Sequence, residues 1–277
     1  MDEKKEYAAN NACEALPSSG GILIPGRRGK LFAHSYFPGG VYPRPVVILC
    51  HGIPGNERLF DFSIYLREHG FCTVNFHYSG SWGSDGSYSV AHCMEDTATV
   101  VDYVQKNECG CYDTDRIYVV GHSLGGLMAS YAIGSLPAVR GGAILAPYNV
   151  RVGAEPVVSG SGDSFLYDIF STETEDFWLR DFRKDVFVAD VTREPERYDL
   201  CTYAAGLSRK SVFLATCTMD LTCPKQRHGG ALADAIRAQN GGAPFMYREY
   251  ETEHCFNLLR SEVKADITNF LLDDLRR

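Results

Sequence analysis

Short apolar runs and amphipathic stretches alternate along most of the chain. Strand-like apolar runs are predicted at 21–26, 30–37, 45–50, 71–78, 116–121, 141–148, 211–217 and 244–250. Helical patterns stand at 57–70, 91–107, 124–136, 225–239 and 257–276. The first two runs are typical of an antiparallel pair. The later runs are apolar throughout, which is typical of parallel strands covered by helices on both faces. We therefore expect an α/β fold with a mostly parallel, eight-stranded sheet.

The regular alternation stops after the sixth predicted strand and resumes before the seventh. The residues between them, 149–207, mix aromatic and charged side chains without a strand–helix rhythm. Because the sheet pattern returns afterwards, we interpret this segment as a small cap (lid) insertion in one α/β core of residues 19–148 and 208–277. Residues 1–18 form a separate N-terminal segment for which we expect little fixed order.

Composition narrows the classes of partner. The 277 residues carry a formal net charge of −8, which argues against nucleic acid or an anionic membrane as the partner. No stretch reaches the roughly 18 apolar residues of a membrane span, and residues 1–17 lack the apolar core of a secretory signal. We expect a cytoplasmic location, with the ten cysteines as thiols. No Cys/His spacing matches a metal site, so neither a metal nor another cofactor is predicted.

One sequence motif indicates the catalytic chemistry, because it presents a candidate nucleophile. Gly121-His122-Ser123-Leu124-Gly125 is a G-x-S-x-G sequence placed between a predicted strand and a predicted helix. The pattern alone is weak, but this context is specific, because it holds the serine above the carboxyl edge of the sheet. We expect Ser123 to adopt a positive φ, and Gly121 and Gly125 to stand where a side chain would collide with neighbouring backbone.

A serine nucleophile needs a base, and the base needs an orienting acid. Asp220 follows the predicted strand 211–217, and His254 follows the last predicted strand. Both therefore stand at the same sheet edge as Ser123, in the chain order Ser, Asp, His. We predict Ser123, Asp220 and His254 as the catalytic residues. Glu251 and Glu253 are the alternative acids.

Backbone amides must also stabilise the oxyanion of an acyl-transfer intermediate. The N–H of Leu124, directly after the serine, is one predicted donor. The N–H of Ile53, in the loop after the strand 45–50, is the other, since Pro54 has no N–H. We assign His51 and His122 structural roles, His51 by bracing this loop.

These residues carry a family resemblance. The order of His51-Gly52-Ile53, GHSLGG, Asp220 and His254 resembles the α/β-hydrolase superfamily over about residues 20–275. The segment 75–86 resembles a loop of its lysophospholipase and esterase branches, and the capped organisation resembles bacterial cinnamoyl and feruloyl esterases. The resemblance implies hydrolysis of carboxylic esters without metal or organic cofactor, but it does not imply the substrate. Our leading hypothesis is a cytosolic serine carboxylesterase that acts on a small-molecule ester, with aromatic (hydroxycinnamoyl-type) and short acyl esters as the candidate substrates.

Two other functions stay open at this point. A peptidase or acyl-aminoacyl hydrolase would use the same triad, and a noncatalytic ligand-binding homologue would keep the pocket. The oligomeric state is also open, with a homodimer among the alternatives. In the cap, we predict four aromatic residues as substrate contacts, with the alternative that they form the core of the cap itself: Phe165, Tyr167, Trp178 and Phe182.

Overall fold

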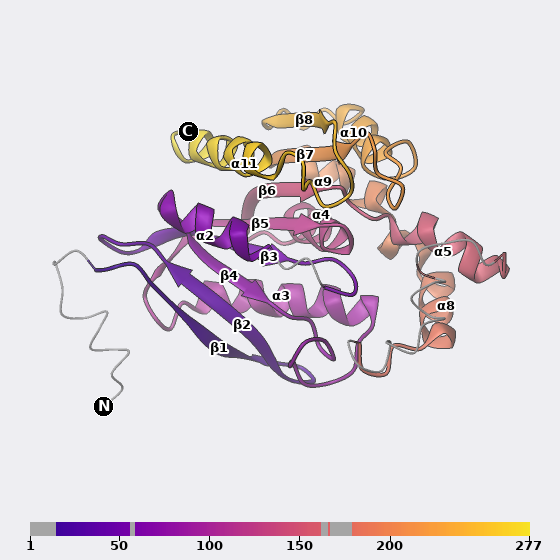
Figure 1. The fold of residues 1–277 in the computed structure, drawn as a ribbon, viewed down its shortest axis with the longest axis horizontal. Helices are drawn as coiled ribbons and strands as arrows, with labels where there is room; N and C mark the ends of the chain where they lie inside the picture. Colours follow the sequence, from indigo (N-terminus) through magenta and orange to yellow (C-terminus); the bar gives the residue numbers. More distant parts are fainter. Residues whose placement is uncertain (1–14, 56–58, 162–165, 167–178) are drawn as a thin grey trace.

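One mixed sheet of eight strands organises the molecule. The computed structural model describes residues 15–55, 59–161, 166 and 179–277, and the strand order is β1-β2-β4-β3-β5-β6-β7-β8 (Figure 1). β2 runs antiparallel to its neighbours β1 and β4, and all other pairs are parallel. The mostly parallel sheet expected from the sequence is thus confirmed. The strands are β1 (Ser18–Gly26), β2 (Gly29–Phe37), β3 (Arg44–Cys50), β4 (Cys72–Phe76), β5 (Tyr112–His122), β6 (Val139–Leu145), β7 (Ser211–Cys217) and β8 (Phe245–Tyr250).

Helices cover both faces of this sheet. α2 (Phe60–Glu68) and α11 (Arg260–Leu275) pack on one face. α3 (Val90–Lys106), α4 (Leu124–Ser135), α9 (Ala204–Leu207) and α10 (Gly229–Arg237) pack on the other.

The two resulting cores explain why the strands read as unbroken apolar runs. Along β3, Val47 and Leu49 enter the core under α2 and α11, whereas Ile48 and Cys50 enter the core under α3 and α4. Successive side chains of a strand point to opposite faces. Since both faces are buried, every position of the strand is apolar.

The final helix begins three residues later than the pattern predicts. Successive turns occupy the preceding residues, with the N–H of Phe256 bonded to the carbonyl of Glu253 and that of Leu259 to the carbonyl of Phe256. Phe256 is buried and has a φ of 59°. This positive φ is incompatible with a right-handed helix at Phe256, and α11 starts at Arg260.

The residues between β6 and β7 leave the sheet at its carboxyl edge and enter β7 at the opposite edge, because the two strands are parallel. They include α5 (Val150–Ser159), α8 (Lys184–Arg193), the 3₁₀ turns η1 (Pro195–Tyr198) and η2 (Leu200–Tyr203), and α9. Figure 1 shows α5 and α8 side by side, beyond the end of the sheet. The Nδ2 of Asn149 donates to Asp199 at 3.0 Å and so joins the start of this segment to its return. Within the described residues, no helix is both long and apolar enough to cross a bilayer.

Candidate active site

Ser123 occupies a strained turn between β5 and α4. Its φ is 58° and its ψ is −120°, a backbone conformation that non-glycine residues avoid. A Cβ on Gly121 would lie 1.9 Å from the carbonyl oxygen of Gly125, and a Cβ on Gly125 would lie 1.9 Å from that of Cys50. The expected positive φ and the two expected clashes are all present. The turn therefore requires both glycines.

Buried Asp220 and half-buried His254 form a pair at the same sheet edge. Asp220 follows β7, and its Oδ1 accepts the N–H groups of Thr222 and Cys223 at 2.9 and 2.7 Å. Its Oδ2 lies 2.7 Å from Nδ1 of His254, in the turn after β8. Three donors thus fix the carboxylate, and the carboxylate fixes the imidazole ring.

The charge state of this pair follows from its contacts. Burial by itself raises the pKa of the Asp220 carboxyl, but the hydrogen bond and charge of His254, with the two amide bonds, outweigh it. The net pKa lies below the ordinary value. Asp220 is therefore a carboxylate at neutral pH, and Nδ1 of His254 must carry the proton that it accepts. In the neutral imidazole with its proton on Nδ1, Nε2 of His254 carries the lone pair of a base.

The alternative acids stand elsewhere. The Glu253 carboxylate accepts the N–H of Asn257 and the hydroxyl of Thr252, so it stabilises the turn before α11. Glu251 is exposed to solvent. Of the three candidates, Asp220 contacts His254.

The two predicted oxyanion donors flank the serine. Leu124 is the first residue of α4, and the loop after β3 passes so close that a Cβ on Gly52 would lie 3.0 Å from the Cβ of Ser123. Ile53 is the next residue of that loop. Across the described part of the chain, neither the Ile53 N–H nor the Leu124 N–H donates a hydrogen bond. The roles of these two amides stay predictions.

The loop after β3 is braced from several sides. Nδ1 of His51 lies 2.7 Å from the carbonyl oxygen of Gly52, and the hydroxyl of Tyr78 donates to the carbonyl of His51. The indole N–H of Trp82 donates to the carbonyl of Pro54 at 2.6 Å. The bracing role expected of His51 agrees with these contacts, and Trp82 adds a brace that the sequence did not indicate.

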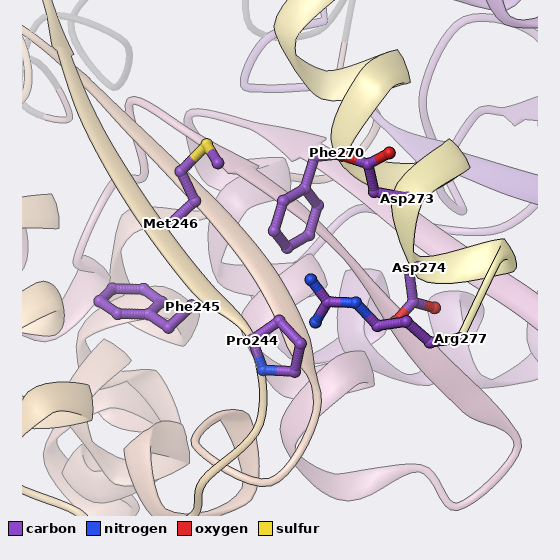
Figure 2. Close-up of a pocket in the computed structure, with 7 residues that line it drawn as sticks. All are labelled: Pro244, Phe245, Met246, Phe270, Asp273, Asp274 and Arg277. Carbon is purple, nitrogen blue, oxygen red and sulfur yellow. The ribbon is translucent and has the colours of Figure 1, made fainter.

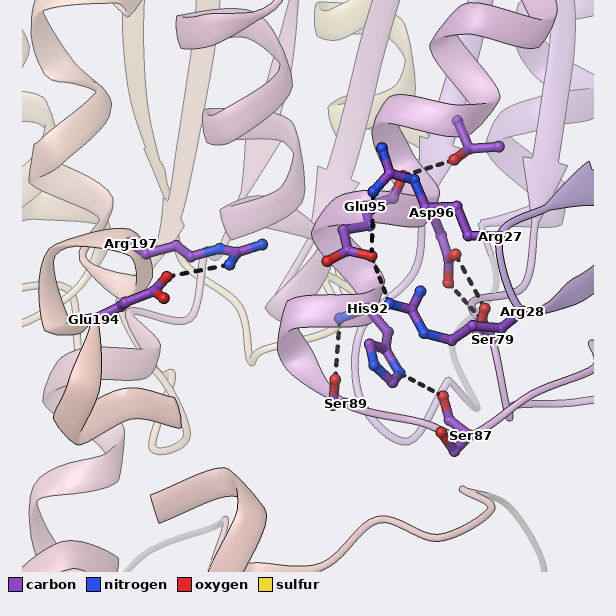
Figure 3. Close-up of polar contacts among 11 residues, drawn as sticks. Arg27, Arg28, Ser79, Ser87, Ser89, His92, Glu95, Asp96, Glu194 and Arg197 are labelled. Carbon is purple, nitrogen blue, oxygen red and sulfur yellow. Dashed lines mark hydrogen bonds and ion pairs between the residues drawn. The ribbon is translucent and has the colours of Figure 1, made fainter. Parts of the chain in front are cut away.

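The loop between β4 and α3 that carries Trp82 is itself fixed to α3. Asp96 of α3 accepts both the N–H and the hydroxyl of Ser79, at 2.7 and 3.0 Å (Figure 3). Ser89 caps the helix by accepting the N–H of His92, and Nδ1 of His92 lies 2.8 Å from the carbonyl oxygen of Ser87. Contacts at both ends thus hold the loop.

The described part of the cap rests on this same loop. The N–H of Tyr88 donates to the carbonyl of Arg180, and the N–H of Arg180 donates to the carbonyl of Gly80, both at 2.8 Å. Phe182 is 6% exposed and packs edge-on against Tyr88 and Phe187. This packing favours the alternative in which Phe182 belongs to the cap core. The other three predicted substrate contacts, Phe165, Tyr167 and Trp178, lie outside the described residues.

Two histidines beside the triad form hydrogen bonds with backbone groups. His122 is buried, and its Nε2 lies 2.9 Å from the carbonyl oxygen of His254. Burial, and then the charge of His254, lower the pKa of His122 to about 3, so it is neutral and donates this bond. Burial lowers the pKa of His228 to about 4, and its Nδ1 accepts the N–H of Asn149. The structural role expected of His122 agrees with this geometry, whereas His228 was not anticipated.

A cysteine that the motifs did not single out also lies in the site. Cys223 is 4% exposed, and its sulfur lies within 4.8 Å of ligand atoms of both Asp220 and His254. Burial, the charge of Asp220 and the nearby thiol of Cys217 raise its pKa well above the ordinary value, against a smaller opposing effect of the adjacent Ser123 hydroxyl. Cys223 is therefore a neutral thiol and a weak nucleophile.

A cavity of about 280 Å³ lies at the opposite edge of the sheet, between the start of β8 and the end of α11 (Figure 2). Asp274 at this edge accepts hydrogen bonds from Tyr118, Arg140 and Ser211, which tie α11 to the sheet. His254 follows the other end of β8, so the cavity is remote from Ser123. Its lining residues are Pro244, Phe245, Met246, Phe270, Asp273, Asp274 and Arg277.

The sheet order, the strained serine turn and the Asp–His pair at the carboxyl edge define the class of α/β hydrolases. In agreement, a sequence model of the alpha/beta hydrolase family matches residues 47–255, and the chain belongs to this family. Comparison with curated proteins returns no match.

Solved structures share the fold at low sequence identity. A ferulic acid complex of Est1E from Butyrivibrio proteoclasticus has a TM-score of 0.71 at 18% identity, over 92% of this chain and 100% of that one. The Pyrococcus furiosus esterase Pf2001 gives 0.67 at 17%, over 92% and 91%. The Pyrococcus horikoshii acylaminoacyl peptidase gives 0.64 at 14%, over 92% and 41%. At these identities the likeness shows the fold.

Proposed function

We propose that the protein is a serine hydrolase that cleaves carboxylic esters through an acyl-enzyme. The observation that carries this proposal is the Asp220–His254 pair, joined at 2.7 Å, at the sheet edge where the strained turn presents Ser123. Ser123 serves as the nucleophile and His254 as its base. Asp220 holds His254 in the tautomer that leaves Nε2 free.

The reaction runs in two stages. Oγ of Ser123 attacks the ester carbonyl carbon while its proton passes to Nε2 of His254, and the amides of Ile53 and Leu124 stabilise the oxyanion. The carbon–oxygen bond to the alcohol then breaks, and His254 returns the proton to the departing alcohol. Water attacks the acyl-enzyme by the same route and releases the carboxylic acid. The N-terminus of α4 adds its positive dipole end beneath the developing charge.

The substrate class is inferred from two structural neighbours. Est1E binds ferulic acid and Pf2001 is an esterase, and both share the fold. We infer that the substrates are hydroxycinnamoyl-type aromatic or short-chain acyl esters. Turnover of a panel of acetyl, long-chain acyl and hydroxycinnamoyl esters tests this inference, and preference for long-chain esters would contradict it. Replacing Phe165, Tyr167 or Trp178 by alanine tests whether these residues set the preference.

The central assignment is tested by single and double variants. Ser123→Ala and His254→Ala should each lower kcat for an aryl acetate by about 10⁴–10⁶, and the double variant should lose little more, because the two residues act as a unit. A fluorophosphonate should label wild-type Ser123. Additive losses in the double variant, or a labelled residue other than Ser123, would contradict the assignment.

An acyl-aminoacyl peptidase remains the second candidate, because the P. horikoshii peptidase shares the fold. The same acyl-enzyme serves amide and ester cleavage, so the assay must compare an aryl ester with an acyl-aminoacyl anilide of the same acyl group. Faster turnover of the anilide would favour the peptidase. No turnover and no fluorophosphonate labelling would instead indicate a noncatalytic binding protein.

A further inference from the structure

Three side chains of metal-binding type converge beside Ser123. Asp220, Cys223 and His254 each place one ligand atom within 4.8 Å of the other two. They come from two loops that follow β7 and β8, and the amide N–H of Cys223 is bonded to Asp220 at 2.7 Å. This backbone hydrogen bond holds Cys223 next to the Asp220 carboxylate and does not depend on the thiol.

The spacing suits a small, four-coordinate cation. Zinc binds sulfur at about 2.3 Å and nitrogen or oxygen at about 2.0–2.2 Å, so ligand atoms of a tetrahedral site lie roughly 3.3–3.8 Å apart. Ligand atoms within 4.8 Å of one another need to approach by about 1–1.5 Å at most, whereas the 2.7 Å contact between Oδ2 of Asp220 and Nδ1 of His254 would widen if Nδ1 were the ligand. The Ser123 hydroxyl lies close to the Cys223 thiol.

Charge and burial also select the cation. Asp220 and Cys223 are buried, and a buried ion must be neutralised by its ligands. One carboxylate, one thiolate and one neutral imidazole balance a charge of +2. Thiolate and imidazole ligands favour Zn²⁺ over Mg²⁺ or Ca²⁺, which prefer oxygen. The side chain of His254 is 19% exposed, so an ion can reach the cluster from solvent.

We propose that Asp220, Cys223 and His254 form an inhibitory Zn²⁺ site that takes the general base out of the reaction. This proposal rests on the proposed function, since the inhibition acts on the same triad. Zinc is no cofactor in this account, and the uninhibited enzyme needs none.

The proton balance explains why binding stops catalysis. The thiol of Cys223 releases its proton to solvent and the sulfur bonds the metal. If the ion binds Nε2 of His254, it occupies the lone pair that accepts the Ser123 proton. If the ion binds Nδ1, the proton on that atom moves to Nε2, which then donates and cannot accept. In both cases Ser123 keeps its proton and does not attack the ester.

The first test measures inhibition of aryl acetate hydrolysis by Zn²⁺, with each variant compared with its own rate in EDTA. Zn²⁺ should inhibit the wild type, EDTA should restore the rate, and Mg²⁺ should have no effect. Cys223→Ser and Cys223→Ala should each raise the half-inhibitory Zn²⁺ concentration about tenfold or more, because changes outside the ligand set already cost that much affinity. Equal inhibition of the wild type and both variants would overturn the proposal.

A matched control addresses the other cysteines. Cys109 and Cys111 form a half-buried pair remote from the triad, after α3. The Cys109→Ser/Cys111→Ser double variant should keep wild-type activity and wild-type sensitivity to Zn²⁺. If this variant loses the sensitivity instead, the ion acts through that pair and the proposed site is wrong.

A second test measures metal binding independently of catalytic activity. Cd²⁺, titrated into the inactive Ser123→Ala variant, should produce a thiolate-to-metal absorption band with one equivalent bound at the site. The Ser123→Ala/Cys223→Ser variant should lose that band. If the Ser123→Ala variant shows the band but still hydrolyses the ester, the proposed catalytic role of Ser123 is wrong, whereas the proposed metal site is supported. An unchanged band without Cys223 would overturn the metal site alone.

Discussion

The Asp220→Asn substitution tests how buried Asp220 sets the tautomer of His254. Oδ1 of Asp220 accepts two backbone N–H groups, and Oδ2 accepts Nδ1–H of His254. In the variant, the asparagine amide must present its oxygen either to the two backbone donors or to His254. Presenting the NH₂ group to the backbone would lose two hydrogen bonds at about 1 kcal/mol each, or roughly 2 kcal/mol in total.

This difference decides the tautomer. A preference of about 2 kcal/mol corresponds to a ratio of roughly 30 in favour of the orientation in which the amide NH₂ faces His254. Nδ1 of His254 must then accept, so the proton moves to Nε2 and the base is lost. We expect kcat for an aryl acetate to fall about 10³–10⁴-fold, the scale known for this change in a serine protease triad.

The assay pairs this variant with Glu253→Gln. Glu253 precedes His254 but caps the turn before α11, so its amide variant should stay within about threefold of wild-type kcat, as expected outside the triad. Both variants should give the cooperative urea unfolding of the wild type. A loss below tenfold in Asp220→Asn, or an equal loss in Glu253→Gln, would refute the reasoning.

Three further outcomes follow from the packing. Gly125→Ala should lower the free energy of unfolding by about 3 kcal/mol or more, because its Cβ would meet the Cys50 carbonyl, whereas Gly20→Ala, with open space around it, should be near neutral in urea unfolding. Between pH 6.5 and 3 the unfolded chain protonates His122 and the folded chain does not, so the free energy of unfolding decreases as the pH is lowered through this range. In His122→Gln the decrease from pH 7 to 5 should be smaller by roughly 2 kcal/mol, and an unchanged decrease would contradict the buried neutral state. Phe182→Ala should lower the free energy of unfolding by about 3 kcal/mol, as expected for a buried aromatic, and a loss below 1 kcal/mol would show that the cap does not depend on it.

The sequence predicts the framework of the site well because its signals are local. The strand before Ser123, the two glycines and the helix behind it follow one another in the chain, and their clashes are set by neighbouring backbone. Asp220 and His254 could be located because strand ends of a parallel sheet meet at one edge. Their 2.7 Å contact then follows from strand order.

The remaining parts of the site depend on contacts between distant residues. His122 supports His254 across 132 positions of the chain, and no local pattern marks such a bond. Cys223 reaches the triad because the turn after β7 folds around Asp220, a geometry that the letters CTMDLTCP do not specify. Phe182 illustrates the same limit, since an aromatic residue in a cap can face either a ligand or its own core, and only packing distinguishes the two.

The most direct test of the central claim is the mass of the intact protein during turnover of a slowly deacylating aryl ester. Rapid acid quenching should trap a species heavier by one acyl group, and peptide mapping should place that group on Ser123. Ser123→Ala should show neither the adduct nor the initial burst of alcohol release. An adduct on another residue, or wild-type turnover by Ser123→Ala, would contradict the account.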